Sequence, residues 1–217
     1  MIYYGRKISM APKNKFTRNE ITLAAVQVVR KKGIRELTAR AVATELGVST
    51  QPIFTCFSTM DEAKKAVRDE AENIYNKYTT EGLNMSIPFY GFGMQYIRFA
   101  KDEPELYRLL FLTAGEEGKS GVMEEMQHSM KLAIESVKKT YDMNQCEAER
   151  YFRDMWLVAH SIATLVVTGN SPYSEGEIST ILTGFSVGIC TAIKETEGFV
   201  DNTFDRDEVF KKLTAKQ

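Results

Sequence analysis

Two side chains in the first quarter of the chain, Arg40 and Gln51, carry chemistry with which proteins distinguish base pairs. A guanidinium can donate two hydrogen bonds to O6 and N7 of guanine, and a glutamine amide can donate to adenine and accept from it. Such side chains must stand on an element narrow enough to enter the major groove, and an α-helix meets that need. The elements around these two residues therefore decide what they can do.

The four residues Leu46-Gly47-Val48-Ser49 form the pattern of a helix-turn-helix. Gly47 supplies the backbone freedom of a tight turn, and Ser49 can cap the helix that follows. We expect one helix over Ala39–Leu46 before the turn and another from Ser49 to about Phe57 after it. Helical hairpins are also ordinary packing units, so this pattern alone does not decide the function.

Charge is divided unevenly along the chain. Residues 1–66 hold 12 Lys and Arg against 5 Asp and Glu, a net charge of +7, whereas residues 67–217 hold 16 against 24, a net charge of −8. A basic end on an acidic body favours contact with a polyanion at that end. A basic arm that is merely solvated gives the same pattern, and on charge alone both interpretations stand.

The rest of the chain also predicts helices. Thr17 with Glu20, and Thr59 with Glu62, are capping boxes that open the first and the fourth helix. Alternation of the strand type and hairpin dipeptides are missing from the sequence. Further helices are expected at about 88–101, 104–112, 122–141, 145–168 and 174–196.

These patterns predict an all-α protein of about nine helices. We expect a flexible N-terminal arm over 1–15, a three-helix helix-turn-helix domain that binds DNA over 16–66, and a helical domain for ligand binding and dimerisation over 67–217. The length of 217 residues is compatible with one small and one medium domain.

Catalytic and metal-binding patterns are missing from the sequence. The three cysteines are scattered, which excludes a disulfide framework or a zinc site and fits a reducing cytosol. The two histidines, His128 and His160, lack metal-ligand spacing, and the phosphate-binding and nucleophile motifs do not occur. We therefore expect no enzyme, no cofactor and no metal. Because no run of 18 apolar residues occurs, we expect no membrane contact either.

Residues 37–62 resemble the helix-turn-helix of the TetR family of bacterial transcriptional repressors. The resemblance rests on a Leu-Thr start, an Ala-centred helix, Leu-Gly-Val-Ser, the Phe-Thr-Cys-Phe segment and a capped fourth helix. It implies a cytoplasmic bacterial homodimer that binds a near-palindromic operator in double-stranded DNA. It further implies a repressor that releases this operator when a small molecule binds the C-terminal domain.

The chain departs from the family pattern at three positions. Phe54, Cys56 and Met60 stand where the family often has Tyr, His and Lys, which puts the details of the phosphate contacts in doubt. A helical dimer that acts through protein partners, with a degenerate DNA-reading part, therefore stays open as an alternative; an enzyme is the least favoured one. Farther on, Met155-Trp-Leu-Val-Ala-His resembles the Trp…His-Gly element of the WHG class of C-terminal domains, with Ser161 in place of the glycine.

The predicted DNA contacts divide into base readers and phosphate partners. Arg40 falls at a position that reads a guanine in the tetracycline repressor, Gln51 is the expected base reader of the third helix, and Phe54 can touch a thymine methyl. Ser49 and Thr59 are caps first and phosphate partners second. The predicted DNA-binding residues are Lys15, Arg18, Thr38, Arg40, Ser49, Thr50, Gln51, Phe54, Thr55, Thr59 and Lys64.

Aromatic and methionine side chains are frequent in the C-terminal part, which favours a cavity for a largely apolar effector, although a plain core would use the same residue types. Gly184 and Gly188 lie four residues apart in an apolar helix and allow close approach of another helix, from a second copy or from the same chain. The predicted ligand-binding residues are Phe92, Tyr96, Phe99, Tyr107, Phe111, Met126, Gln127, Met130, Trp156 and His160.

Overall fold

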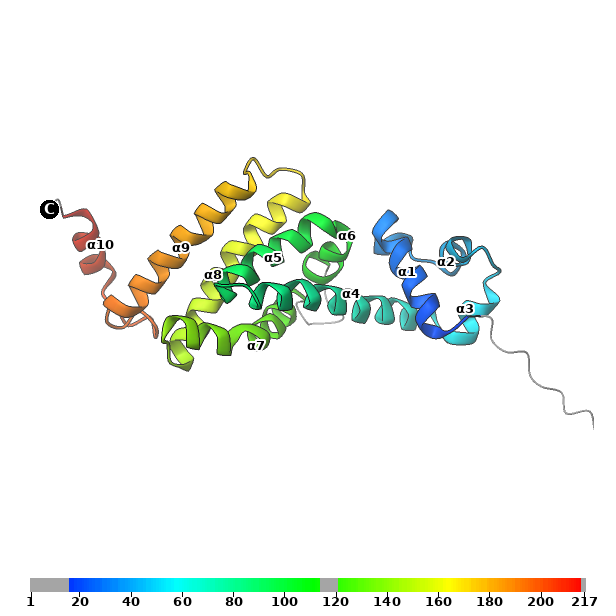
Figure 1. The fold of residues 1–217 in the computed structure, drawn as a ribbon, viewed down its shortest axis with the longest axis horizontal. Helices are drawn as coiled ribbons and strands as arrows, with labels where there is room; N and C mark the ends of the chain where they lie inside the picture. The colour runs from blue at the N-terminus through cyan, green and yellow to red at the C-terminus, as the bar shows by residue number, and fades with distance from the viewer. Residues whose placement is uncertain (1–15, 114–120, 216–217) are drawn as a thin grey trace, which may run out of the picture. The chain divides into compact units, whose positions relative to one another are not determined.

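The computed structural model describes residues 16–113 and 121–215, and helices are the regular elements of these residues (Figure 1). The all-α prediction is thereby confirmed for this part of the chain. The elements are α1 (Arg18–Lys32), the 3-10 helix η1 (Ile34–Glu36), α2 (Ala39–Leu46), α3 (Gln51–Cys56), α4 (Met60–Leu83), α5 (Pro88–Asp102), α6 (Pro104–Tyr107), the π-helix η2 (Arg108–Leu112), α7 (Gly121–Tyr141), α8 (Gln145–Val167), α9 (Glu175–Glu195) and α10 (Arg206–Thr214).

Two elements differ from the predicted ones. The helix expected over 104–112 is α6 followed by a π-helical turn, in which Thr113 Oγ1 donates to the carbonyl of Arg108 five residues back at 2.9 Å. The last helix, α10, was not expected. It is short, and Asp205 caps it by accepting from the backbone N–H groups of Asp207 and Glu208.

The chain divides into two compact units, Met1–Glu70 (unit 1) and Ala71–Gln217 (unit 2). The division falls inside α4, which is one continuous helix. The predicted boundary after residue 66 lies in the same helix, and the predicted domain functions stay predictions. The predicted arm over 1–15 lies outside the described residues.

Unit 1 forms around α1. Its capping box is present as predicted, since the N–H of Glu20 donates to Thr17 Oγ1 at 3.2 Å and the N–H of Thr17 donates back to Glu20 Oε2 at 2.7 Å. One face of α1 is buried and packs against α2 and α3. From these two helices, Val42 and Ile53 reach the same core and are almost fully buried. This packing fixes the orientation of the two short helices.

The turn between α2 and α3 depends on Gly47, whose φ of 67° lies in the left-handed region that favours glycine. The N–H of Val48 donates to the carbonyl of Ala43 at 2.9 Å and so ends α2. The prediction that Ser49 caps the next helix is wrong. Thr50 already has a helical backbone and occupies the N-cap of α3 without a side-chain bond, because its carbonyl accepts from Ile53 and Phe54 instead.

Unit 2 is built around α5 and α8, which pack along each other, with α7 and α9 against α8 (Figure 1). A pair of glycines brings the end of α4 against α5. A Cβ atom on Gly82 would lie 2.5 Å from the carbonyl carbon and oxygen of Gly91, and a Cβ on Gly91 would overlap the carbonyl of Gly82. This backbone-to-backbone approach has no room for a side chain at either position.

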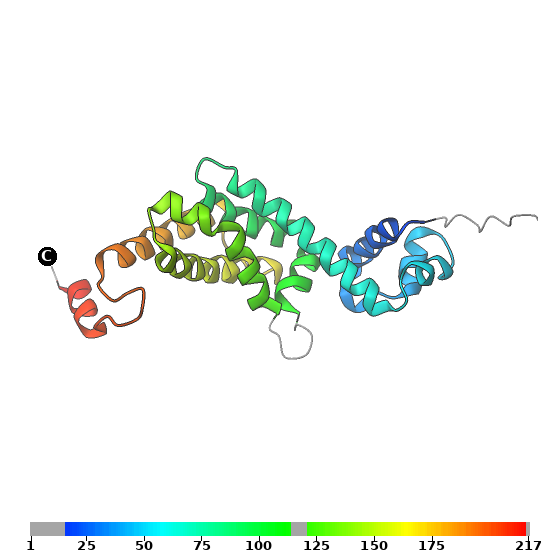
Figure 2. The ribbon, with the colours of Figure 1, turned by 90° about the horizontal axis from the view of Figure 1, so that it is seen from below.

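The outermost long helix, α9, is largely exposed. Figure 2 shows it beside α8, with α10 beyond its C-terminal end. In the part of the chain that the structure describes, α9 is the one helix long and apolar enough to cross a membrane by length and composition, and 17% of its most apolar stretch is buried. The helix itself was expected over 174–196, but the criterion of an unbroken run of 18 apolar residues did not single it out, because Gly, Ser and Thr interrupt its apolar residues.

Candidate functional site

Unit 1 presents one exposed face of α3. Gln51, Phe54 and Thr55 are three and four residues apart, so they share this face, while Ile53 and Phe57 are buried on the other side. Phe54 is 51% exposed although it is a large aromatic residue. The amide, the hydroxyl and the flat ring therefore stand together on the outside of a helix that the core holds in place.

On the preceding helix, Arg40 is also exposed and makes no ion pair within the described residues. The carbonyl of Arg40 accepts from Thr44 Oγ1 at 2.9 Å, and the carbonyl of Gln51 accepts from Thr55 Oγ1 at the same distance. The hydroxyl protons of both threonines are thus used within their own helices. The Arg40 guanidinium and the Gln51 amide keep their donors and acceptors for a partner.

The predicted phosphate partners near helix starts differ in the hydrogen bonds and ion pairs that they make within unit 1. Thr38 caps α2 by accepting from the N–H of Ala41 at 3.1 Å, and Thr59 accepts from the N–H of Glu62 at 3.2 Å, so both hydroxyls act as caps. The Thr59 capping box is altered, because Glu62 Oε2 accepts from the N–H of Ser58 at 2.8 Å. Lys64 pairs with Asp61 at 2.9 Å, Ser49 is exposed, and Lys15 lies outside the described residues.

Arg18 has partners inside unit 1. Its Nη1 donates to Glu62 Oε1 at 2.7 Å and to the carbonyl of Cys56 at 2.8 Å, and its guanidinium lies 4.2 Å from the ring centre of Phe57. Hydrogen bonds from Arg18 and from the Ser58 N–H hold the pKa of Glu62 below its usual value. Arg18 therefore ties α1 to the end of α3 and the start of α4, and its phosphate contact stays a prediction.

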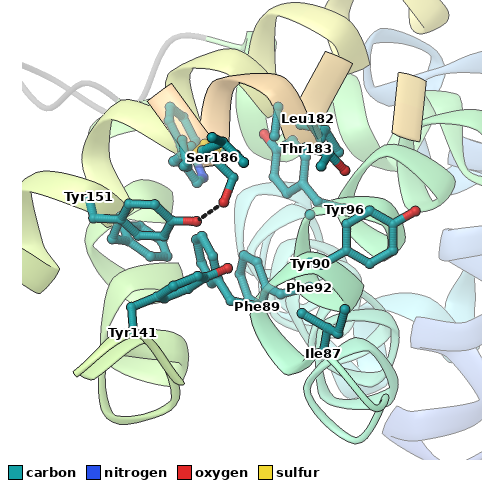
Figure 3. A pocket seen from close by; sticks show the side chains of 16 residues that line it. Ile87, Phe89, Tyr90, Phe92, Tyr96, Tyr141, Tyr151, Leu182, Thr183 and Ser186 are labelled. Atoms are coloured by element: carbon teal, nitrogen blue, oxygen red, sulfur yellow. Dashed lines mark hydrogen bonds between the residues drawn. The ribbon is translucent and has the colours of Figure 1, made fainter. Parts of the chain in front are cut away.

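Unit 2 holds a cavity of about 190 Å³ (Figure 3). Side chains of α5, α8 and α9 line it, together with Tyr141 at the end of α7. Figure 3 shows the rings of Phe89, Phe92 and Tyr151 close together, and a hydrogen bond of 2.6 Å joins the Tyr151 hydroxyl to Ser186 Oγ on α9. Of the described residues that line the cavity, none is charged.

Three of the ten predicted ligand-binding residues, Phe92, Tyr96 and Trp156, line this cavity. Sequence reasoning missed Tyr151 and Ser186. The signal was present for Tyr151, since residues 151, 152, 155, 156 and 159 repeat at helical spacing and all line the cavity. No such signal marks Ser186, because its role depends on how α9 lies against α8.

The other predicted ligand residues lie elsewhere in unit 2 and stay predictions. Phe99, Phe111 and Met126 are buried core residues outside the cavity, Met130 is half-buried, and Gln127 is exposed. Tyr107 and His160 form a polar cluster beside the cavity, described next.

His160 lies at the centre of this cluster. Its Nδ1 is 2.9 Å from the Tyr96 hydroxyl and 3.0 Å from the Tyr107 hydroxyl. Burial lowers the pKa of His160 below its ordinary value, because the charged imidazolium is poorly solvated there. A neutral ring with an unprotonated Nδ1 can accept a hydrogen bond there from one hydroxyl, so the cluster favours the tautomer with its proton on Nε2.

Trp156 stacks on His160, with ring centres 4.7 Å apart and planes 9° from parallel. The indole and the Tyr96 ring also meet edge to face, with ring centres 6.0 Å apart. The side chain is 3% exposed, and its indole N–H has no hydrogen-bond partner among the described residues. Since a buried indole N–H usually finds an acceptor, this donor is an exception.

Comparison with solved structures identifies the fold of this chain. The sequence matches no family model and no curated protein. Three solved structures match over most of their lengths. The multidrug binding protein EbrR, solved in complex with imidazole, is 19% identical with a TM-score of 0.54, over 84% of this chain and 97% of that one.

Two further matched structures are named after the TetR family. A TetR-like transcriptional regulator from Rhodococcus sp. RHA1 is 16% identical with a TM-score of 0.59, over 82% of this chain and 97% of that one. A TetR family member from Streptomyces coelicolor A3, SCO1917, is 21% identical with a TM-score of 0.57, over 80% of this chain and 98% of that one. The chain has a TetR-like fold. The predicted order of a helix-turn-helix followed by a helical C-terminal part is thereby confirmed, and the WHG class stays a prediction.

One face of α9 has no partner among the described residues. A Cβ atom on Gly184 or Gly188 of α9 would meet nothing within 4 Å, and Phe185 and Val187 beside them are more than half exposed. The close approach that these glycines allow is therefore not made within the described chain. Packing against the described residues of the same chain, the alternative interpretation, does not account for these glycines.

Proposed function

We propose that this chain is a sequence-specific DNA-binding regulator of transcription, acting in the bacterial cytoplasm. The observation that carries the proposal is the exposed face of α2 and α3, where Arg40, Gln51 and Phe54 stand outside a core that fixes both helices. This is the helix-turn-helix geometry that presents side chains to base edges in the major groove. The TetR-like fold supports the proposal, since two of the matched structures are named as transcriptional regulators or TetR family members.

A homodimer follows from the same proposal. Two reading helices must lie about one turn of DNA apart to bind the two halves of a near-palindromic operator. The open face of α9 holds Gly184 and Gly188, with the exposed side chains of Phe185 and Val187 beside them. This face can pack against the same face of a second copy. A two-fold contact of this kind would also cover the apolar surface that otherwise allows α9 a membrane environment.

The regulator responds to a ligand in this proposal. The cavity of unit 2 is apolar, preformed and of a size for a small molecule. Two conformations of the dimer would differ in the spacing of their reading helices, and only one would fit DNA. A ligand that binds the other conformation more tightly shifts the population towards it and so ends repression. EbrR, a multidrug binding protein solved with imidazole, supports a small-molecule site in this fold.

The DNA proposal is tested with Arg40→Ala in the full-length dimer. We expect the variant to lose about 1–3 kcal/mol of operator affinity and to relax the preference at one base position, because a bidentate base contact is removed. Arg35→Ala is the matched control, since it removes another exposed positive charge from unit 1, outside α2 and α3. Gel-shift titrations on the wild-type operator and its single-base variants measure both effects. Equal losses for the two variants at every base would contradict base reading by Arg40.

The dimer proposal is tested by sedimentation of Gly188→Leu. A Cβ atom at Gly188 meets nothing within 4 Å in the isolated chain, so we expect the variant to fold. The leucine would block the close approach of a second α9 and should yield monomers. Lys139→Leu, which adds the same side chain on the exposed surface of α7, should remain a dimer. A Gly188→Leu variant that sediments as the wild type does would place the interface elsewhere.

A further inference from the structure

The exposed face of α3 carries no charge. None of the residues Gln51–Cys56 is Lys, Arg, Asp or Glu, although residues 1–66 have a net charge of +7. The exposed side chains of this helix are Gln51, Phe54 and Thr55. An amide, an aromatic ring and a threonine therefore make up most of the surface that α3 can offer to base edges.

Thr55 offers a methyl group rather than a hydroxyl donor. Its Oγ1 donates to the carbonyl of Gln51 at 2.9 Å, so the hydroxyl proton is used inside the helix. The rest of this exposed side chain is its γ-methyl group. A DNA partner can therefore gain apolar contact from Thr55 but no donated hydrogen bond.

The ring of Phe54 also calls for an apolar partner. It is 51% exposed, and the core side of the same segment is already filled by Ile53 and Phe57, each 1% exposed. Without a hydroxyl, the ring cannot donate to a phosphate. Apolar surface of this size gains free energy when a partner removes it from water.

The major groove offers one apolar group to such a surface, the C5-methyl group of thymine. The other groups that distinguish the bases there are hydrogen-bond donors and acceptors. Gln51 and Thr55 are four residues apart, about 6 Å along a helix, whereas neighbouring base pairs are about 3.4 Å apart. The methyl groups that α3 can contact therefore lie on the base pair that Gln51 reads or on pairs next to it.

We infer that α3 recognises its operator through thymine methyl groups, which pack against the Phe54 ring and the Thr55 methyl beside the adenine that Gln51 binds. This inference rests on the proposed DNA-binding function, because it names the chemical group that the same face selects. It makes Phe54 and Thr55 specificity-determining residues, although neither side chain donates a hydrogen bond to a base. A cytosine methylated at C5 carries the same group at the same place and restores the contact.

Deoxyuridine in place of thymidine tests the inference, since it removes the methyl group and leaves every hydrogen-bonding group of the base pair. The probe is the duplex that the full-length protein selects from random DNA, synthesised with each thymidine replaced in turn. We expect one or two positions in each half-site at which the replacement weakens binding about fourfold, the effect of one buried methyl group. Replacement in both half-sites should weaken binding about fifteenfold, because separate positions contribute additively.

Cytosine gives the converse test. At a position that responds to deoxyuridine, exchange of the T·A pair for C·G should weaken binding, because the methyl group and the acceptor of thymine are both lost. A 5-methylcytosine at the same place should regain about fourfold. This gain adds the methyl group back to an otherwise unchanged base pair.

Three variants assign the effect to side chains. Phe54→Ala removes the ring, and Thr55→Ser removes the methyl group but keeps the hydroxyl, so each should abolish the deoxyuridine effect at its own position. Lys64→Ala is the matched control, since it removes an exposed side chain of unit 1 and should leave the deoxyuridine effects unchanged. Because all three side chains are exposed, we expect the variants to fold, and circular dichroism checks this.

Several outcomes would overturn the inference. They are selected half-sites without thymine, no thymidine that responds to deoxyuridine, no gain from 5-methylcytosine, or deoxyuridine effects that survive both Phe54→Ala and Thr55→Ser. The inference and the regulatory proposal fail in different ways. An enriched operator without methyl dependence would refute the inference alone, whereas recovery of no enriched duplex would refute sequence-specific binding itself.

Discussion

The proposed DNA-reading surface of unit 1 and the cavity of unit 2 assemble their side chains in different ways. The reading surface takes all its residues from positions 40 to 55, on two short helices joined by one turn. The cavity takes its residues from positions 87 to 187, on α5, α8 and α9 with the end of α7. The first site is local in sequence and the second is made by tertiary packing.

This difference governs how each site can fail. A side chain on the exposed face of α3 can change without disturbing the core, so its substitution alters binding and little else. The cavity walls are also core residues, so their substitution changes stability and binding together. Substitutions that separate packing from recognition therefore sharpen the comparison most.

The largest effect is expected where α4 meets α5. Gly82→Ala places a Cβ 2.5 Å from the backbone of Gly91, which must shift, and we expect a loss of about 2–3 kcal/mol of stability. Gly93→Ala is the matched control on α5. Its Cβ lies at an ordinary distance from its neighbour, and it should stabilise the protein by about 0.5–1 kcal/mol. Thermal unfolding of both variants measures the contrast, and equal stabilities would refute the tight crossing.

A smaller effect is expected in unit 1. Arg18→Ala removes the link from α1 to Cys56, Phe57 and Glu62, and we expect a loss of about 1 kcal/mol, since the pair is partly exposed. Lys31→Ala removes the exposed pair with Glu45 and should cost less. If urea unfolding gave the two variants the same midpoint, Arg18 would have no special structural role.

The smallest effect is a dependence of stability on pH in unit 2. Burial keeps the pKa of His160 below the unfolded value of about 6.5, so the unfolded chain binds more protons as the pH falls through that range. The free energy of unfolding should therefore decrease as the pH is lowered from about 7 to about 5.5. His160→Gln should flatten this slope in chemical unfolding followed by circular dichroism. An unchanged slope would show that another group is responsible.

The local features of unit 1 could be predicted from the sequence. The capping box at Thr17, the limits of α2 and the left-handed turn at Gly47 each depend on residues a few positions apart. Even there, the start of α3 was misplaced. The carbonyl of Thr50 accepts from the N–H groups of Ile53 and Phe54, and no side chain caps α3. A sequence pattern of capping residues does not reveal where a backbone carbonyl takes this role.

The cavity could be predicted only in part. Phe92, Tyr96 and Trp156 were predicted from their residue types, since aromatic and methionine side chains are frequent in this part of the chain, and all three line the cavity. Residue type does not distinguish a ring that lines a cavity from one that fills the core, such as Phe99 or Phe111. That distinction depends on how closely α5, α8 and α9 approach one another, and a single sequence does not contain it.

The central claim is that α2 and α3 read base sequence, twice, through two-fold symmetry. Selection of bound sequences from random duplex DNA, at moderate salt and with the full-length protein, tests it most directly. The account predicts one enriched motif with two inverted half-sites whose centres lie about one helical turn apart, and an affinity that falls steeply as salt rises. Recovery of unenriched duplexes, or of a single half-site without symmetry, would contradict it.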